Sequence, residues 1–136
     1  MVVRNVTVLL VDDEADIRAL LREIVLEELD GETCTVLEAK DGQEAIDLIR
    51  EEAVDIIMTD MKMPKVDGLT LLKEAKKVLP DVEVIVMTGY SEDYTREEAL
   101  RLGARDYITK PFEVDEVRLI LMKACLKVEG RRDSGP

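Results

Sequence analysis

Side chains able to bind a cation and accept a phosphoryl group stand where four apolar runs of this sequence end. A run rich in Val and Ile leads directly into Asp60. Three other runs end in the same way, and together the four supply three carboxylates, a hydroxyl and an ammonium, namely Asp12, Asp13, Asp60, Thr88 and Lys110. Open α/β sheets do their chemistry at the carboxyl ends of their strands. This set of groups suits a divalent cation and a phosphoryl acceptor.

Short apolar runs alternate with helical patterns along the chain. Runs of Val and Ile predict parallel strands that are buried on both faces, because helices cover each face of such a sheet. Five strands are expected, each followed by a helix, at residues 6–11, 33–38, 54–59, 82–87 and 105–108. A spacing near 3.6 residues gives the first helix its apolar side, Ile17, Leu20, Leu21, Ile24 and Leu29. The same spacing gives the last helix Val114, Val117, Leu121, Ala124 and Val128. The pattern predicts an α/β fold.

Turn and capping residues indicate where the helices begin and end. The Asp-Gly pairs at residues 41–42 and 67–68 should open the second and third helices, and Leu79-Pro80-Asp81 should end the third. Gly130 suits the end of the last helix. We therefore expect one domain over residues 1–128 and a C-terminal tail or truncated linker over residues 129–136.

Composition excludes several classes of function. The 136 residues carry a net charge of −12, so a basic face for nucleic acid is not expected. No apolar run approaches the ~20 residues of a membrane span, and residues 1–5 are too short for a signal peptide, which predicts a cytoplasmic protein. Cys34 and Cys125 are expected to be buried thiols. Because the chain has no histidine, it cannot supply phosphohistidine itself.

Each candidate residue also has an ordinary structural interpretation. Asp12 and Asp13 could simply stabilise the positive amino-terminal end of the first helix. Lys110 could be a solvated lysine, Thr88 a β-branched strand residue and Tyr107 a half-buried strand aromatic. The functional interpretation is favoured because carboxylates from two strand ends should face one another. Together they would offer the oxygen ligands that a hard cation needs.

The order of these motifs resembles that of response-regulator receiver domains, the phosphoacceptor part of two-component systems. The resemblance covers roughly Val6 to Val128. It rests on motifs that follow one another at strand ends: Asp12-Asp13, Asp60 with Pro64 and Gly68, Met87-Thr88-Gly89, and Tyr107-Ile108-Thr109-Lys110-Pro111-Phe112. It implies a doubly wound, flavodoxin-like (βα)5 fold with a parallel sheet of order 2-1-3-4-5 and helices on both faces. It also implies a signalling phosphoprotein that is not a classical enzyme.

The resemblance assigns roles at the cation and acceptor site. Asp60 is the expected phosphoacceptor. Mg²⁺ or Mn²⁺ is the expected cofactor, bound by Asp13, Asp60 and the backbone carbonyl of Lys62, with Asp12 acting mainly through a bound water. Lys62, two positions past Asp60, is also expected to tune hydrolysis of the acyl phosphate.

The resemblance further implies how a phosphoryl group would be sensed. A cis peptide bond between Lys110 and Pro111 would turn the lysine inward, where it could pair with the acceptor and later with the phosphoryl group. Thr88 and Tyr107 are the expected switch residues, which would alter the surface of the fourth helix, fifth strand and fifth helix. Tyr90 is expected to hinder the water that attacks the phosphoryl group.

Partners follow from the same resemblance. A sensor histidine kinase or a histidine phosphotransfer domain is the expected phosphoryl donor. An output domain beyond the C-terminus is expected, as is a phosphorylation-dependent homodimer through the fourth helix, fifth strand and fifth helix. Direct contact with nucleic acid or membrane is not expected.

Two alternatives from other classes use similar groups. A phosphatase of the haloacid-dehalogenase type has an Asp nucleophile and Mg²⁺, but its motif is Asp-x-Asp on the first strand, whereas Asp12 and Asp13 are adjacent here. A flavodoxin-like cofactor binder would need a Ser/Thr/Gly-rich run at a strand end to hold phosphate, and the strand-end loops of this chain lack one.

Overall fold

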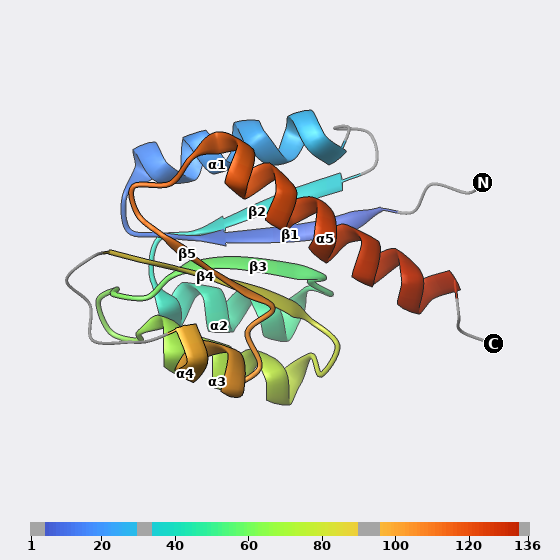
Figure 1. The fold of residues 1–136 in the computed structure, drawn as a ribbon. Helices are drawn as coiled ribbons and strands as arrows, with labels where there is room; N and C mark the ends of the chain where they lie inside the picture. The colour runs from blue at the N-terminus through green and yellow to red at the C-terminus, as the bar shows by residue number, and fades with distance from the viewer. Residues whose placement is uncertain (1–4, 30–33, 90–95, 134–136) are drawn as a thin grey trace.

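A five-stranded parallel sheet lies between two layers of helices in the computed structural model, which describes residues 5–29, 34–89 and 96–133 (Figure 1). The strands are β1 (Val6–Val11), β2 (Cys34–Ala39), β3 (Ile56–Asp60), β4 (Glu83–Thr88) and β5 (Asp106–Thr109). Their order is β2-β1-β3-β4-β5, and each neighbouring pair is parallel. The doubly wound fold and its strand order, both expected from the sequence, are therefore confirmed.

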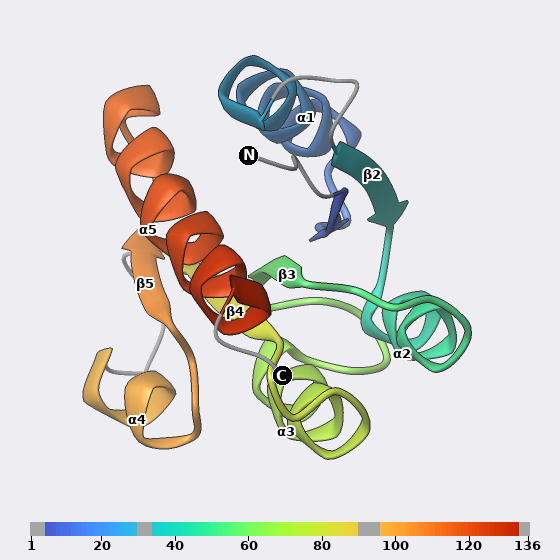
Figure 2. The same cartoon turned by 90° about the vertical axis from the view of Figure 1, so that its right-hand side faces the viewer.

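The five helices divide between the two faces of the sheet. They are α1 (Ala15–Leu29), α2 (Gly42–Glu51), α3 (Gly68–Val78), α4 (Arg96–Arg101) and α5 (Val114–Asp133). Helices α1 and α5 cover one face, and α2, α3 and α4 cover the other (Figures 1 and 2). Successive strand residues point to opposite faces, so Val8 and Leu10 pack towards α1 and α5, while Leu9 and Val11 pack towards the other layer. Within the described ranges, no helix is long and apolar enough to cross a membrane.

The predicted helix starts agree with the structure. Asp41 caps α2 by accepting a hydrogen bond from the Glu44 N–H (2.8 Å), and Asp67 caps α3 by accepting one from the Thr70 N–H (2.8 Å). Helix α3 ends with Leu79 as its cap, directly before the proline that cannot continue it. Both aspartates therefore cap the helices that the sequence predicted to begin there.

The strand boundaries differ slightly from those expected. β3 and β4 begin one or two residues later than predicted, and they extend through Asp60 and Thr88 rather than ending before them. Asp60 pairs with Met87 of β4, and Thr88 pairs with Thr109 of β5. The two residues are therefore fixed by the sheet itself, which restricts their backbone more than a loop would. The predicted strand start at Thr33 lies outside the described residues.

Helix α5 does not end at Gly130, so that prediction is wrong. The helix continues to Asp133, with Gly130 exposed inside it. Arg131 holds the last turn against the amino end of β4: its Nη1 donates to Glu83 Oε2 (2.8 Å) and its Nη2 donates to the Asp81 carbonyl. These contacts offset the roughly 1 kcal/mol by which a glycine disfavours a helix. The role of residues 129–136 as a tail or linker stays a prediction.

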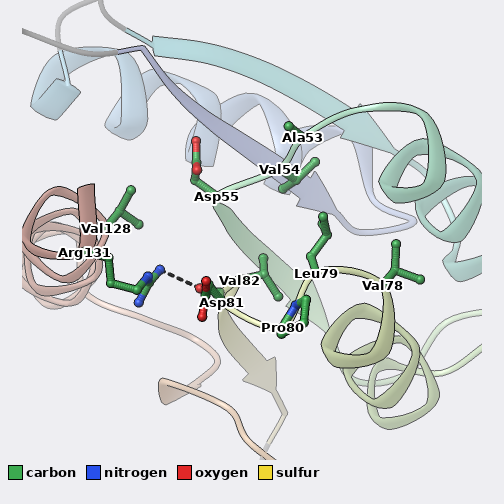
Figure 3. Close-up of a pocket in the computed structure, with 10 residues that line it drawn as sticks. All are labelled: Ala53, Val54, Asp55, Val78, Leu79, Pro80, Asp81, Val82, Val128 and Arg131. Carbon is green, nitrogen blue, oxygen red and sulfur yellow. Dashed lines mark hydrogen bonds between the residues drawn. The ribbon is translucent and has the colours of Figure 1, made fainter. Parts of the chain in front are cut away.

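The amino ends of β3 and β4 border a cavity of about 400 Å³ beneath the end of α5 (Figure 3). Val54, Leu79 and Val82 supply apolar surface, and Arg131 reaches across it to the loop that precedes β4. Glu83 also lies 3.6 Å from the Nε of Arg105, so two guanidinium groups share one buried carboxylate. Ion pairs therefore hold α5 and the residue before β5 against the amino end of β4.

Both cysteines are buried, as predicted. Cys34 at the start of β2 and Cys125 in α5 belong to the same apolar cluster, although 90 residues separate them in sequence. Burial raises the pKa of the Cys125 thiol to about 12. It is therefore an apolar packing group at neutral pH.

Candidate functional site

The carboxyl ends of β1, β3, β4 and β5 bring the predicted site residues to one edge of the sheet. Asp60 and Thr88 are the last residues of their strands, and the parallel register sets Asp60 beside Met87. Asp12 directly follows β1. Lys110 directly follows β5, and its backbone N–H donates to the Thr88 carbonyl (2.6 Å). The structure thus brings these residues together, while their chemical roles stay predictions.

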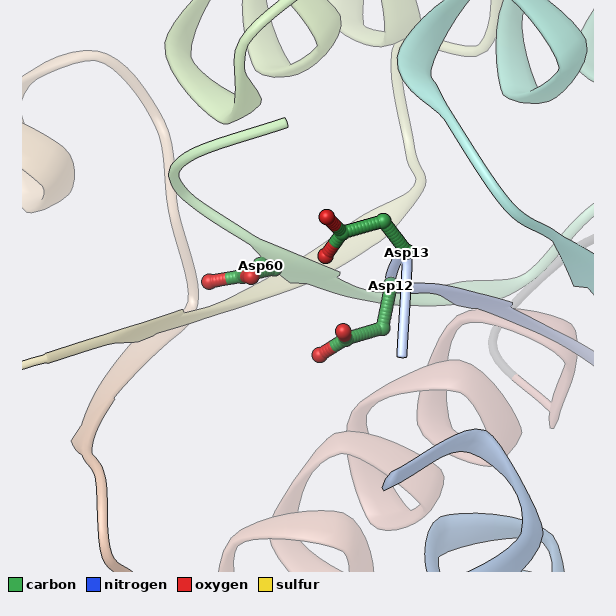
Figure 4. A group of neighbouring side chains, drawn as sticks. All are labelled: Asp12, Asp13 and Asp60. Atoms are coloured by element: carbon green, nitrogen blue, oxygen red, sulfur yellow. The ribbon is translucent and has the colours of Figure 1, made fainter. Parts of the chain in front are cut away.

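Three carboxylates gather at this edge. Asp12, Asp13 and Asp60 each place an oxygen within 4.8 Å of the others (Figure 4). Asp12 and Asp60 are buried, whereas Asp13 is exposed. Carboxylates this close repel one another when ionised, and burial strengthens the repulsion because less water screens it. The cluster therefore needs positive charge.

Lys110 supplies part of that charge. Its Nζ lies 2.9 Å from Asp12 Oδ2 and 3.4 Å from Asp60 Oδ2, and its side chain is largely buried. The peptide bond between Lys110 and Pro111 is cis, as the resemblance implies. The predicted pairing of Lys110 with Asp60 is thus present, but the shorter contact is to Asp12. One ammonium faces two carboxylates.

Burial shifts the pKa values of this pair. The pKa of Asp60 is raised to about 6, mainly because the carboxyl group is removed from water; Lys110 opposes this shift and Asp12 adds to it. Burial alone would lower the pKa of Lys110, but its contacts with Asp12 and Asp60 outweigh that effect and raise it. At neutral pH the ammonium is therefore charged, and Asp60 is ionised in surroundings that stabilise its charge incompletely.

Asp12 is occupied by protein partners on both oxygens. Its Oδ1 accepts from the Glu14 N–H (2.9 Å) and its Oδ2 accepts from Lys110. Its backbone carbonyl accepts from Arg18 Nη1 (2.7 Å), and Arg18 also pairs with Glu38 of β2. The sequence pattern gave no role to Arg18, so this anchor of the β1–α1 turn was missed. Nothing in the helical pattern distinguishes an arginine that folds back from one that extends into water.

The donor set fits a hard divalent cation. Mg²⁺ prefers oxygen ligands and keeps several waters, so two carboxylates and one carbonyl suffice. Asp13 makes no hydrogen bond or ion pair within the described ranges, so its oxygens are available. Asp60 has one oxygen that accepts from the Met61 N–H (2.8 Å) and one that faces Lys110. Both oxygens of Asp12 make contacts of 2.9 Å, whereas the contact between Asp60 Oδ2 and Lys110 Nζ is longer, at 3.4 Å.

The two predicted switch residues lie on neighbouring strands. Thr88 is fully buried at the end of β4, with its hydroxyl 3.4 Å from the Gly89 carbonyl. Tyr107 is half-buried in β5 and packs against the apolar cluster under α2, α3 and α4. Lys62 is exposed in the loop after β3. Tyr90 lies outside the described residues.

A family comparison agrees with this geometry. The profile of the response regulator receiver domain matches residues 8–122, which include every strand-end residue described above. The chain belongs to the response-regulator receiver domain family. The phosphatase and the flavodoxin-like cofactor binder, the two alternatives from the sequence, are not favoured, because the proteins similar to this chain are response regulators.

Related receiver domains occur alone and within longer proteins. The chain is 37% identical over 114 residues to sporulation initiation phosphotransferase F of Bacillus subtilis, a match that covers 84% of this chain and 89% of that protein. It is 38% identical over 117 residues to the regulatory protein AtoC of Escherichia coli, covering 86% of this chain but only 24% of AtoC. Among solved structures, the receiver domain of AraT, a response regulator from Geobacillus stearothermophilus, superposes with a TM-score of 0.83 at 39% identity, covering 93% of this chain and 97% of that one.

Proposed function

We propose that this receiver domain accepts a phosphoryl group on Asp60 from the phosphohistidine of a sensor histidine kinase or a histidine phosphotransfer domain. The observation that carries the proposal is the position of Asp60: a buried carboxylate whose charge is only partly balanced by Lys110, beside Asp12 and Asp13. Burial leaves the oxygens of Asp60 less stabilised by water than those of an exposed aspartate, and a cation bound by the cluster would supply the positive charge that a transferred phosphoryl group needs.

The transfer forms one bond and breaks one. A carboxylate oxygen of Asp60 donates an electron pair to phosphorus, and the P–N bond of the donor breaks. The departing imidazole keeps the electron pair of the broken P–N bond and, having carried a proton on its other nitrogen, leaves as neutral imidazole. The product is an acyl phosphate on Asp60. Since the transition state is loose, positioning and charge matter more than a strong base, which suits a chain without histidine.

Residues of this chain hold the reacting groups in place. Asp13, Asp60 and the Lys62 carbonyl would bind Mg²⁺ or Mn²⁺, which when bound supplies positive charge next to the phosphoryl oxygens. Lys110 stays near the acceptor through its contact with Asp12, so its ammonium can pair with a phosphoryl oxygen once Asp60 no longer carries a full charge. Asp12 thus positions Lys110.

The response would begin at Thr88. Its buried hydroxyl stands at the end of β4, next to the β3 end that carries Asp60. A hydrogen bond from this hydroxyl to a phosphoryl oxygen would draw the β4–α4 loop inward. Tyr107, half-buried in the adjacent strand, would then change rotamer and alter the surface formed by α4, β5 and α5.

The partners proposed for that surface follow from the relatives. Among them are proteins named as transcriptional regulators, including NtrC of Klebsiella pneumoniae, of whose length the matched region spans 24%. We propose that the altered surface acts on a C-terminal output domain or on a second copy of the chain through α4, β5 and α5. Sedimentation of the phosphorylated and unphosphorylated protein would distinguish these two cases.

The acceptor is tested with a small phosphodonor. Wild-type protein incubated with acetyl phosphate and Mg²⁺ should gain the mass of one phosphoryl group, and Asp60→Ala should gain none. Asp47→Ala removes an exposed carboxylate on α2 and should behave like the wild type. A normal adduct on Asp60→Ala would show that another residue is the acceptor.

The switch needs a separate test. Thr88→Ala should still accept phosphate, because Asp60, Lys110 and Asp13 remain. In the wild type, a beryllofluoride mimic should shift NMR resonances across α4 and from Tyr107 to Leu121. In Thr88→Ala the shifts should stay near Asp60 and Lys110, since a hydrogen bond to a charged group, about 1.5–3 kcal/mol, is as large as typical coupling energies. Distant shifts of wild-type size in the variant would contradict the role given to Thr88.

A further inference from the structure

The first turn of α2 lies directly against the loop that follows Asp60. This loop, residues 61–67, joins β3 to α3 and carries the Lys62 carbonyl proposed as a cation ligand. α2 begins with Asp41, whose Oδ1 accepts from the Glu44 N–H, and with Gly42, which is buried. Nothing in the proposed chemistry itself requires this contact between α2 and the loop.

Gly42 is held close to Val66 of the loop. A Cβ atom added to Gly42 would lie 2.6 Å from Val66 Cβ and nearer still to the Val66 carbonyl oxygen. Real Cβ atoms do not approach other atoms so closely, and backbone cannot rotate away as the end of a long side chain can. Any side chain at position 42 must therefore push the loop away from α2.

The loop has a backbone shape that needs support from outside. The Val66 N–H donates to the Pro64 carbonyl (2.8 Å), and Lys65 between them has a φ of 71°. A three-residue turn with positive φ at its centre is rare and strained. The Nζ of Lys65 lies 3.7 Å from Asp41 Oδ2, but its side chain is 68% exposed, so this ion pair is weak. The Gly42 contact is the stronger support.

A second glycine, Gly68, joins the two ends of the loop. The Gly68 N–H donates to the Met61 carbonyl (2.8 Å), and a Cβ on Gly68 would lie 2.6 Å from the Asp60 carbonyl oxygen. The loop is therefore closed by the bond from Gly68 to Met61, next to Asp60, and supported at Val66 by Gly42, from a different helix. Lys62 lies between the two supports.

We propose that Gly42 is a positioning residue for the cation site: by letting α2 seat against Val66, it sets the position of the loop that presents the Lys62 carbonyl. The inference rests on the proposed function, since it assumes that this carbonyl binds the cation. It extends the site to a residue of α2 that touches neither the acceptor nor the cation.

The effect of Gly42→Ala on Mg²⁺ binding and on melting temperature distinguishes a positioning role from an effect on helix stability alone. The φ of Gly42 is not positive, and alanine is a better helix former than glycine. If the contact with Val66 were unimportant, Gly42→Ala would leave Mg²⁺ binding unchanged and raise the melting temperature. If the contact positions the loop, Mg²⁺ binding weakens.

Calorimetric titration of the metal-free protein with Mg²⁺ provides the test. Gly42→Ala should bind Mg²⁺ about tenfold more weakly than the wild type, as is usual when a residue that orients a metal ligand is lost. Phosphorylation by acetyl phosphate should slow at low Mg²⁺ and recover at saturating Mg²⁺. Gly130→Ala makes the same chemical change in α5, where a Cβ meets nothing within 4 Å, and should leave the Mg²⁺ affinity unchanged.

Two NMR measurements keep the inference testable if binding or folding fails. Without metal, Gly42→Ala should shift the backbone resonances of residues 61–67, whatever the cation affinity of the site. In the wild type, Mg²⁺ should shift the Gly42 amide resonance, because coupling between two positions is reciprocal. A wild-type protein that does not bind Mg²⁺ would overturn the proposed cation site. Unchanged Mg²⁺ affinity in Gly42→Ala, or a Gly42 amide indifferent to Mg²⁺ in a wild type that binds it, would overturn only the role of Gly42.

Discussion

The two ends of the sheet carry charged residues in opposite arrangements. At the carboxyl end, three carboxylates crowd together and one lysine contacts two of them. At the amino end, one buried carboxylate, Glu83, faces two arginines, and Asp55 accepts a hydrogen bond from the Thr7 N–H (2.8 Å). The same sheet therefore has an excess of negative charge at its carboxyl end and a carboxylate paired with arginines at its amino end.

This difference in charge balance distinguishes residues that serve function, at the carboxyl end, from residues that serve stability, at the amino end. A cluster that repels itself lowers the stability of the fold and remains useful only if it binds something positive or reacts. A satisfied ion pair needs no further partner. The comparison predicts that neutralising a carboxylate stabilises the protein at the carboxyl end and destabilises it at the amino end.

The largest effect is expected from Asp60→Asn in metal-free buffer. The pKa of Asp60, about 6, lies above the value of 3.8 that it has when exposed, so ionisation costs the folded state free energy. That cost is fully present above pH 6, fades as the pH falls towards 4 and is absent below it. Asp60→Asn should therefore stabilise the protein by about 2 kcal/mol at pH 7.5. Urea unfolding at several pH values measures this.

The control for that comparison is Asp47→Asn, which neutralises an exposed carboxylate on α2 and should change stability by less than about 0.5 kcal/mol. If Asp60→Asn left the free energy of unfolding unchanged or lowered it at pH 7.5, the carboxylates at the carboxyl end would not destabilise the fold.

At the amino end, Glu83→Gln should destabilise the protein by about 1 to 2 kcal/mol. It leaves Arg131 and Arg105 without their shared counter-charge and weakens the anchor of the last turn of α5. Glu74→Gln, which breaks an exposed pair with Lys77, should cost less than about 0.5 kcal/mol. Equal unfolding curves for the wild type and Glu83→Gln would mean that this end is not held by its ion pairs.

Mg²⁺ should relieve the repulsion at the carboxyl end. At a free concentration about ten times its dissociation constant, selective binding to the folded protein adds roughly 1.4 kcal/mol. Asp13→Ala should lose most of this gain, because it removes the exposed carboxylate that is proposed as a cation ligand. Thermal unfolding with and without Mg²⁺ compares the two. A shift of the same size in Asp13→Ala would place the bound cation elsewhere.

The smallest effect concerns the helix that closes the amino end. Gly130 lies exposed inside α5, and a Cβ there meets no atom within 4 Å. Gly130→Ala should stabilise the protein by about 0.5 to 1 kcal/mol, because alanine favours the helix. A loss of stability in thermal unfolding would indicate that the helix ends at Gly130.

The sequence predicted the fold well where one physical rule dominated. Apolar runs gave the strands to within two residues, and the aspartate caps gave the first residues of α2 and α3, because burial and capping act locally. The convergence of Asp12, Asp13, Asp60 and Lys110 followed from parallel strands that end at one edge.

Features that depend on contacts between distant segments were not predicted. Arg18 bonds to the Asp12 carbonyl, and Arg131 extends α5 beyond Gly130 through Asp81 and Glu83. A long flexible side chain has the same sequence pattern whether it extends into water or folds back, so periodicity cannot reveal these bonds. The positive φ of Lys65 was missed for a similar reason, since lysine gives no turn signal.

The central claim, that the crowded carboxyl end accepts a phosphoryl group on Asp60, is tested most directly by locating the acyl phosphate. Protein phosphorylated with acetyl phosphate and Mg²⁺ is treated with borohydride, which reduces an acyl phosphate to an alcohol and converts the modified aspartate to homoserine. Peptide mass spectrometry should then find homoserine at position 60 and nowhere else. Homoserine at position 12, 13 or 55, or its absence from a protein that had gained phosphate, would contradict the account.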